Sequence, residues 1–101
     1  MNINALEGKP VELPNYPIKS VQVVGTFGGA TVTIEGSNMV LDNVLELTYA
    51  PQVDNLETAI TFTSTGIKQI FSNTYWIRPR ISSGGNVNTD IDVYLIAHTM
   101  R

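Results

Sequence analysis

Apolar and polar residues alternate along most of this 101-residue chain. The alternation is clearest over residues 21–36, 60–63, 75–81 and 91–98. A period of two residues is typical of β-strands with one buried face, because successive side chains of a strand point to opposite sides. Residues 54–59 and 66–71 also fit a short helical turn, but neither segment is long enough to establish a helical period. We therefore expect an all-β protein, folded as a jelly-roll-like antiparallel β-sandwich of about six to eight strands.

Gly28-Gly29 separates two of the alternating segments. A two-residue glycine turn between alternating strands is a strong hairpin signal. Pairing Phe27 with Ala30 would set Val23 opposite Ile34 and would make one face of the hairpin apolar. A slip of one residue would destroy this sorting. The pattern predicts a β-hairpin of residues 21–27 and 30–36.

The expected core consists of apolar residues on the inward faces of these segments. A further strand is expected over Leu45, Leu47 and Tyr49, which alternate with polar residues and end before Pro51. The core positions that we predict are Val23, Val32, Ile34, Phe62, Ile77, Val93 and Leu95.

The first seventeen residues differ from the rest of the chain, because they carry Pro10, Pro14 and Pro17. Each proline lacks a backbone N–H donor and favours extended geometry in the residue before it. We expect residues 1–17 to form an extended N-terminal arm that packs along its own domain or a neighbour, and residues 18–101 to form a single domain. Within this arm, Leu13 and Tyr16 are the residues that we expect to contact a partner.

The composition argues for binding rather than catalysis. Charged residues make up 15% of the chain, the formal net charge is −3, and there is no cysteine. The single histidine, His98, has no second histidine or thiolate with which to build a usual zinc site, and Asp90 and Asp92 border a Gly/Asn loop in which aspartate is a common turn residue. We expect no enzyme activity, metal or cofactor. Six scattered basic residues and the lack of a long apolar run argue against nucleic-acid and membrane partners.

Two alternating segments offer a candidate interface. Trp76, Arg78 and Arg80 project opposite the inward side chains of one strand, and Tyr94 and Ile96 do so on the next. Strands that follow one another in a chain are often neighbours in a sheet. Together these residues would form one surface of the composition that is favoured at the centres of interfaces. Burial of Trp76 under the arm or in the core is the alternative.

The segments Val21–Ser37, Tyr75–Ile81 and Asp90–Leu95, with Gly84-Gly85 between the last two, resemble the jelly-roll cement or decoration proteins of short-tailed bacteriophages. The resemblance covers roughly residues 21–95. It implies a virion protein, made in the host cytoplasm, that binds the major capsid protein on the outer capsid surface as a dimer or trimer. No active site comes with it, since the function of this family is interface formation.

Two other functions fit the same residues. In a carbohydrate-binding module, Trp76 and Tyr94 would form a stacking platform, with Arg78, Asp92 and His98 as hydrogen-bonding groups. A glycan binder should be monomeric with exposed aromatic residues, whereas a tail or connector subunit of the virion should form a ring.

Overall fold

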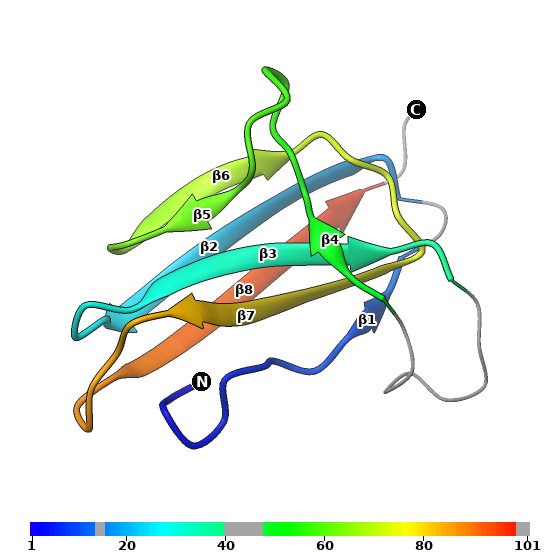
Figure 1. The fold of residues 1–101 in the computed structure, drawn as a ribbon. Coiled ribbons are helices and arrows are strands. Elements are labelled where there is room, and N and C mark those ends of the chain that lie inside the picture. The colour runs from blue at the N-terminus through cyan, green and yellow to red at the C-terminus, as the bar shows by residue number, and fades with distance from the viewer. Residues whose placement is uncertain (14–15, 40–47, 99–101) are drawn as a thin grey trace.

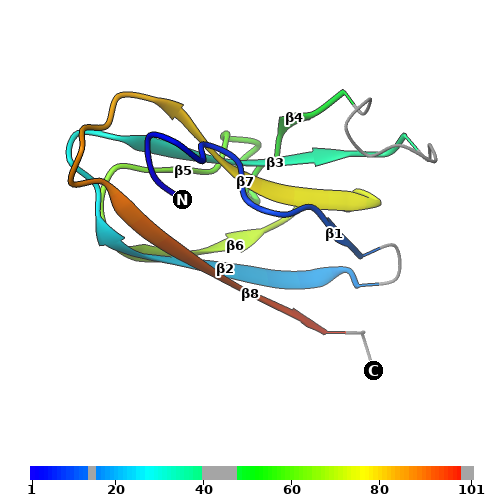
Figure 2. The same ribbon diagram turned by 90° about the horizontal axis from the view of Figure 1, so that it is seen from below.

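Two antiparallel β-sheets face each other across a shared apolar core (Figures 1 and 2). The structure is a computed structural model and describes residues 1–13, 16–39 and 48–98. These residues contain strands but no helix, as the alternation predicted. The strands are β1 (Val11–Glu12), β2 (Ile18–Thr26), β3 (Thr31–Ser37), β4 (Ala50–Pro51), β5 (Thr61–Phe62), β6 (Gly66–Ile70), β7 (Trp76–Ser83) and β8 (Asp90–His98).

The two sheets differ in width. Sheet I has the order β1-β7-β3-β4, and the short strand β5 also pairs with β3. Sheet II has three strands in the order β6-β2-β8. In Figure 2 sheet I forms the upper layer and sheet II the lower layer. All pairings are antiparallel, and β2–β8 keeps one register from Ile18↔His98 to Thr26↔Asp90.

The predicted hairpin is wrong, although its turn is present. Gly28 and Gly29 both have positive φ (57° and 84°), and Ala30 N donates to Phe27 O at 2.9 Å. The strands that leave this turn enter different sheets: β2 pairs with β6 and β8, and β3 pairs with β4, β5 and β7. Val23 therefore lies opposite Val93 and not opposite Ile34. The alternation could not separate the two arrangements, because both turn the same side chains towards the core.

The core contains residues from both sheets. Five of the predicted core residues are buried: Val23, Val32, Ile34, Phe62 and Ile77. The other two, Val93 and Leu95, point inward but are only partly buried. Ile60, Ile70, Ile81 and Ile91 complete the aliphatic centre.

The N-terminal segment lies along its own domain. β1 pairs with β7, and Gly8 N donates to Pro79 O at 2.9 Å, while Ile81 N donates to Leu6 O at 2.7 Å. Residues 6–13 thus lie along the edge of sheet I, and Met1 bonds to Ile91 of sheet II, so the segment packs along its own domain. Contact of this segment with a neighbouring subunit stays a prediction.

Two other expectations concern the middle of the chain. The strand over Leu45, Leu47 and Tyr49 lies mostly outside the described residues. Of the two segments compatible with a helical turn, Gly66–Ile70 is strand β6, and residues 54–59 form a turn in which the Asp54 carboxylate accepts from the backbone N–H groups of Leu56 and Thr58.

Candidate protein-binding surface

Trp76, Arg78 and Arg80 project from the outer face of sheet I, as their alternation with Ile77 and Ile81 predicted. Both arginines are held there by Glu35 of the neighbouring strand β3. Its carboxylate, only 7% exposed, accepts from Arg78 Nε at 3.1 Å and from Arg80 Nε at 2.9 Å. A buried carboxylate needs such partners, because desolvation disfavours its charge.

Arg78 has two further contacts. Its Nη1 lies 2.8 Å from Glu7 Oε2, and its guanidinium lies 3.8 Å from the centre of the Tyr49 ring. Burial raises the pKa of Tyr49, and Arg78 opposes that rise. We call these five residues the Glu35 cluster: Glu7, Glu35, Tyr49, Arg78 and Arg80. The cluster has two negative carboxylates and two positive guanidinium groups, so its formal charges cancel and its charged groups pair within the chain.

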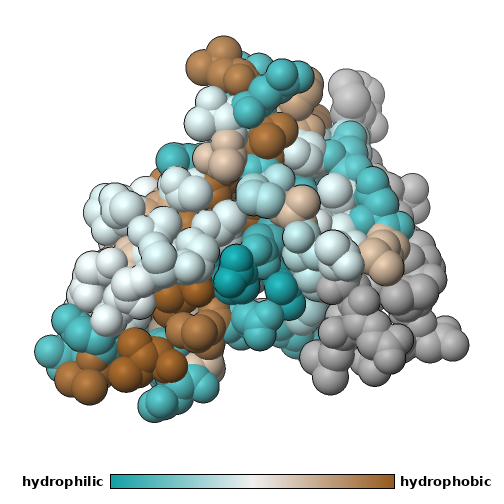
Figure 3. Space-filling model, viewed as in Figure 1, coloured by the Kyte–Doolittle hydropathy of each residue, from teal (hydrophilic) through white to brown (hydrophobic). Residues whose placement is uncertain are grey.

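Trp76 is also engaged within the chain. Its ring meets Tyr75 edge-to-face at 5.5 Å, and its side chain is half-buried. Tyr75 in turn donates from its hydroxyl to Glu12 Oε1 at 2.7 Å, and this hydrogen bond raises the pKa of Tyr75. Figure 3, which views sheet I from outside, shows a face of mainly neutral and hydrophilic residues.

Tyr94 and Ile96 lie in the other sheet, so the single surface predicted from β7 and β8 is wrong. The two strands are consecutive in the chain, but the connection from Gly84 to Thr89 carries it from sheet I to sheet II. Trp76 and Tyr94 project from the outer faces of opposite sheets. A carbohydrate platform built from these two rings is therefore not formed.

The outer face of sheet II carries exposed apolar side chains, and its acidic residues, Asp90 and Asp92, lie at one end of β8. Tyr94 lies opposite Gln22, which lies opposite Ile67, so one row of side chains crosses all three strands. Tyr94 and Ile96 are each 57% exposed, and Ile67 is 65% exposed. None of the outward residues of β2, β6 and β8 is lysine or arginine. We call the following residues the sheet II face: Ile18, Gln22, Ile67, Tyr94 and Ile96.

Sequence reasoning found only part of this face. It identified Tyr94 and Ile96 but missed Ile67 and Ile18. Ile67 lies in a segment too short to show whether its period was that of a strand or a helix. Glu35 directly follows the inward-facing Ile34, so the alternation turns it to the outer face, and nothing in the alternation indicates that it is buried there.

The expected arm residues have different roles. Leu13 packs against the core and donates its backbone N–H to Tyr75 O at 2.8 Å. Tyr16 is exposed, and its carbonyl accepts from Lys19 Nζ at 2.8 Å. Leu13 thus stabilises the fold, while the Tyr16 ring remains available for contact.

Other kinds of site were sought within the described ranges. Residues 1–13, 16–39 and 48–98 hold no cluster of three or more potential metal ligands. No helix in them is long and apolar enough to cross a membrane. His98 is exposed at the end of β8, on the same outer side as Asp90 and Asp92.

Comparisons with known proteins leave the family open. No protein-family model matches the chain, and neither the curated proteins nor the solved structures gave a significant match.

Proposed function

We propose that this chain is a structural virion protein that binds the outer capsid lattice through the sheet II face. The observation that carries the proposal is the set of exposed apolar and aromatic side chains on this three-stranded antiparallel sheet. Large apolar side chains in a contiguous patch are characteristic of protein-binding surfaces. Few charges have to be desolvated when such a face docks.

The resemblance of residues 21–95 to phage cement proteins supplies the partner. A cement protein adds contact area between neighbouring capsomers, and several weak contacts on one particle reinforce each other. The jelly-roll relationship, the dimer or trimer and the location on the capsid surface belong to this proposal.

The sheet II face fits the role better than the β7 side chains do. Arg78 and Arg80 already have acidic partners within the chain, and Trp76 is half-buried. A partner would have to compete with Glu35 for both guanidinium groups. Among the described residues, the side chains of Tyr94, Ile96 and Ile67 form no ion pair or hydrogen bond, and all three are more than half exposed.

Two measurements test the proposal. A mass-spectrometric inventory of purified phage particles should contain the chain. Capsids from a phage deleted for its gene should then bind the added protein and carry it through a sucrose gradient. Ile96→Asp and Tyr94→Asp should each weaken this binding by about 30-fold, the loss of one interface hot spot.

Leu56→Asp is the matched control, because Leu56 is 79% exposed in the turn between β4 and β5. It introduces the same charge in place of an apolar residue outside the sheet II face. Wild-type affinity of both face variants would refute the assignment of this face, and absence of the chain from particles would refute the function.

A further inference from the structure

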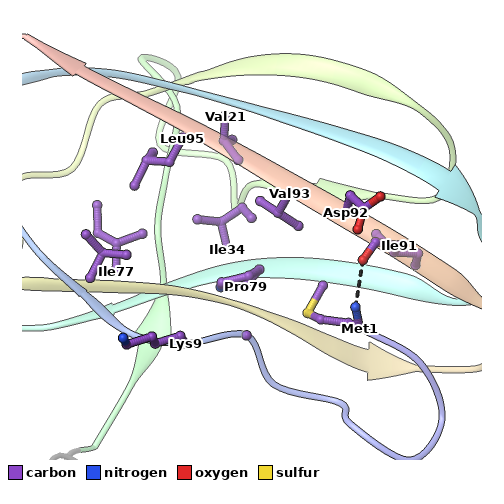
Figure 4. A pocket seen from close by; sticks show the side chains of 12 residues that line it. Met1, Lys9, Val21, Ile34, Ile77, Pro79, Ile91, Asp92, Val93 and Leu95 are labelled. Carbon is purple, nitrogen blue, oxygen red and sulfur yellow. Dashed lines mark hydrogen bonds between the residues drawn. The ribbon is translucent and has the colours of Figure 1, made fainter.

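Strand β8 is an edge strand with a long free side. It pairs with β2 on one side only. On its other side, Ile91 N donates to Met1 O at 2.9 Å, and the Met1 amino group donates to Ile91 O at 2.6 Å (Figure 4). This reciprocal pair is the antiparallel arrangement in which both polar groups of a residue point to the same neighbour.

The contact with Met1 fixes the direction of the remaining backbone groups of β8. Backbone groups alternate between the two sides of a strand, so Asp92, Tyr94 and Ile96 point towards β2. Val93, Leu95 and Ala97 point the same way as Ile91, away from β2. Among the described residues, no hydrogen bond reaches the N–H or C=O groups of these three residues on that side.

An apolar groove runs beside this free edge, between the two sheets. It has a volume of about 310 Å³. Val93 and Leu95 line it from sheet II, and Val11, Ile77 and Pro79 line it from sheet I (Figure 4). Within residues 1–13, 16–39 and 48–98, sheet II ends at β8, and the inward side chains of Val93 and Leu95 are only partly buried.

We propose that this groove accepts one extended strand of a partner protein, which adds to sheet II beside β8. The strand would run antiparallel to β8, as every other pair in the two sheets does. Its residues opposite Val93, Leu95 and Ala97 would form the backbone hydrogen bonds and place apolar side chains in the groove. The residues between them would face solvent beside Tyr94 and Ile96, so the partner segment alternates apolar and polar residues.

Two other occupants fit the groove less well. A fatty acyl chain would fill the apolar space but would leave the three donors and three acceptors of β8 unpaired. A second copy could also pair through its own β8. Its β7 and β1 would then collide with β7 and β1 of the first copy, because these strands cover the groove in each copy. A single strand meets both the polar edge and the apolar lining.

The test uses amide hydrogen exchange of the full chain, resolved by residue with NMR. In the free protein the amides of Asp92, Tyr94 and Ile96 should be protected and those of Val93, Leu95 and Ala97 should exchange quickly. The probe is the blocked peptide acetyl-Lys-Val-Thr-Val-Thr-Val-Lys-amide. Its binding should slow exchange at Val93, Leu95 and Ala97 by at least about 10-fold, because each amide gains a backbone partner.

Two controls isolate the backbone contacts. The same peptide with N-methylated valines keeps its side chains but loses the three donors, and it should not protect these amides. Ala97→Pro removes one donor at an edge position that tolerates proline and should weaken the wild-type peptide about 5-fold or more. Leu56→Thr, in the exposed turn between β4 and β5, should leave peptide binding unchanged.

Several results would overturn the proposal. Slow exchange of all three amides in the free, dilute protein would show that the edge is already covered. If exchange at these three amides slows as the protein concentration is raised without peptide, the occupant is a second copy of the chain. Equal binding of the N-methylated peptide would exclude strand addition. So would changes in the NMR chemical shifts of the groove residues that appear with dodecanoate but not with the peptide. The proposal does not depend on the capsid assignment, since the sheet II face is tested by separate variants.

Discussion

Arg80 donates to the buried carboxylate of Glu35 across two neighbouring strands, with 2.9 Å between Nε and Oε2. The other oxygen of the same carboxylate accepts from Arg78 at 3.1 Å. One acidic residue therefore holds two arginines of β7 in fixed positions on the outer face of sheet I. Replacing Glu35 should therefore lower the free energy of unfolding more than replacing any other member of the Glu35 cluster.

Glu35→Gln should lower the free energy of unfolding by about 3 kcal/mol, because it removes the charge that compensates both guanidinium groups. Glu7→Gln is the matched control: Glu7 is 54% exposed, so its ion pair with Arg78 should contribute less than about 1 kcal/mol. Urea unfolding followed by the fluorescence of Trp76, the only tryptophan, measures both. Equal costs for the two variants would contradict the assigned role of Glu35.

Ile34→Ala and Leu95→Ala should differ in cost. Ile34 is 1% exposed at the centre of the core, and its truncation should cost about 2–5 kcal/mol. Leu95 borders the groove, where water already reaches its side chain, so its truncation should cost roughly 1–2 kcal/mol. Urea denaturation of the two variants gives the comparison. A larger loss for Leu95→Ala would show that the groove is closed in solution.

Lys19 should make stability depend on pH. It is 1% exposed in β2, and its ammonium donates to Tyr16 O and to Asn73 Oδ1, both at 2.8 Å. Burial lowers the pKa of Lys19 in the folded state, whereas in the unfolded chain its pKa stays at about 10.4. Between these two values the unfolded state binds more protons, so this group makes the folded state more stable as pH rises.

The variant Lys19→Met isolates this effect. The free energy of unfolding of the wild type, minus that of Lys19→Met, should increase as pH is raised from 7 towards about 10. Contributions from Tyr49 and Tyr75 cancel in the difference, since both proteins retain them. Urea titrations at intervals of pH measure it, and a difference that stays level across this range would count against the burial of the ammonium.

The Gly28-Gly29 turn offers a matched pair of substitutions. Both residues have positive φ, which costs a side chain about 1–2 kcal/mol. A Cβ at Gly29 would meet no atom within 4 Å, whereas a Cβ at Gly28 would lie 2.6 Å from Asn86 Oδ1 and 2.8 Å from Thr89 Oγ1. Gly28→Ala should therefore be the more destabilising of the two. Thermal unfolding compares them, and the reverse order would mean that the 84–89 loop adapts without cost.

Local pattern predicted which side of each strand is buried, but not which strands pair. Ile77 and Arg78 were assigned to opposite faces correctly, because the period of a strand is a property of adjacent residues. Val23 and Ile34 were assigned to the same core correctly but paired wrongly. The choice between β3 and β8 as the neighbour of β2 depends on residues more than sixty positions away.

The candidate site shows the same limit. The exposure of Tyr94 and Ile96 followed from alternation, whereas their separation from Trp76 required knowledge of the sheet to which each strand belongs. The prolines predicted an extended N-terminal segment. They carried no information about its pairing with β7, which depends on backbone hydrogen bonds and not on side-chain type.

The division of β2 and β3 between the sheets has a consequence for biosynthesis. The longest ladders of β2 and β3 are formed with strands that are synthesised much later. β3 pairs with β7, and β2 pairs with β8. A ribosome-bound chain that stops before residue 90 can pair β2 with β6 but lacks the longer ladder of β2 with β8. Such long-range pairing slows folding and leaves intermediates prone to aggregation. The native structure should therefore assemble only after residue 98 has emerged from the exit tunnel.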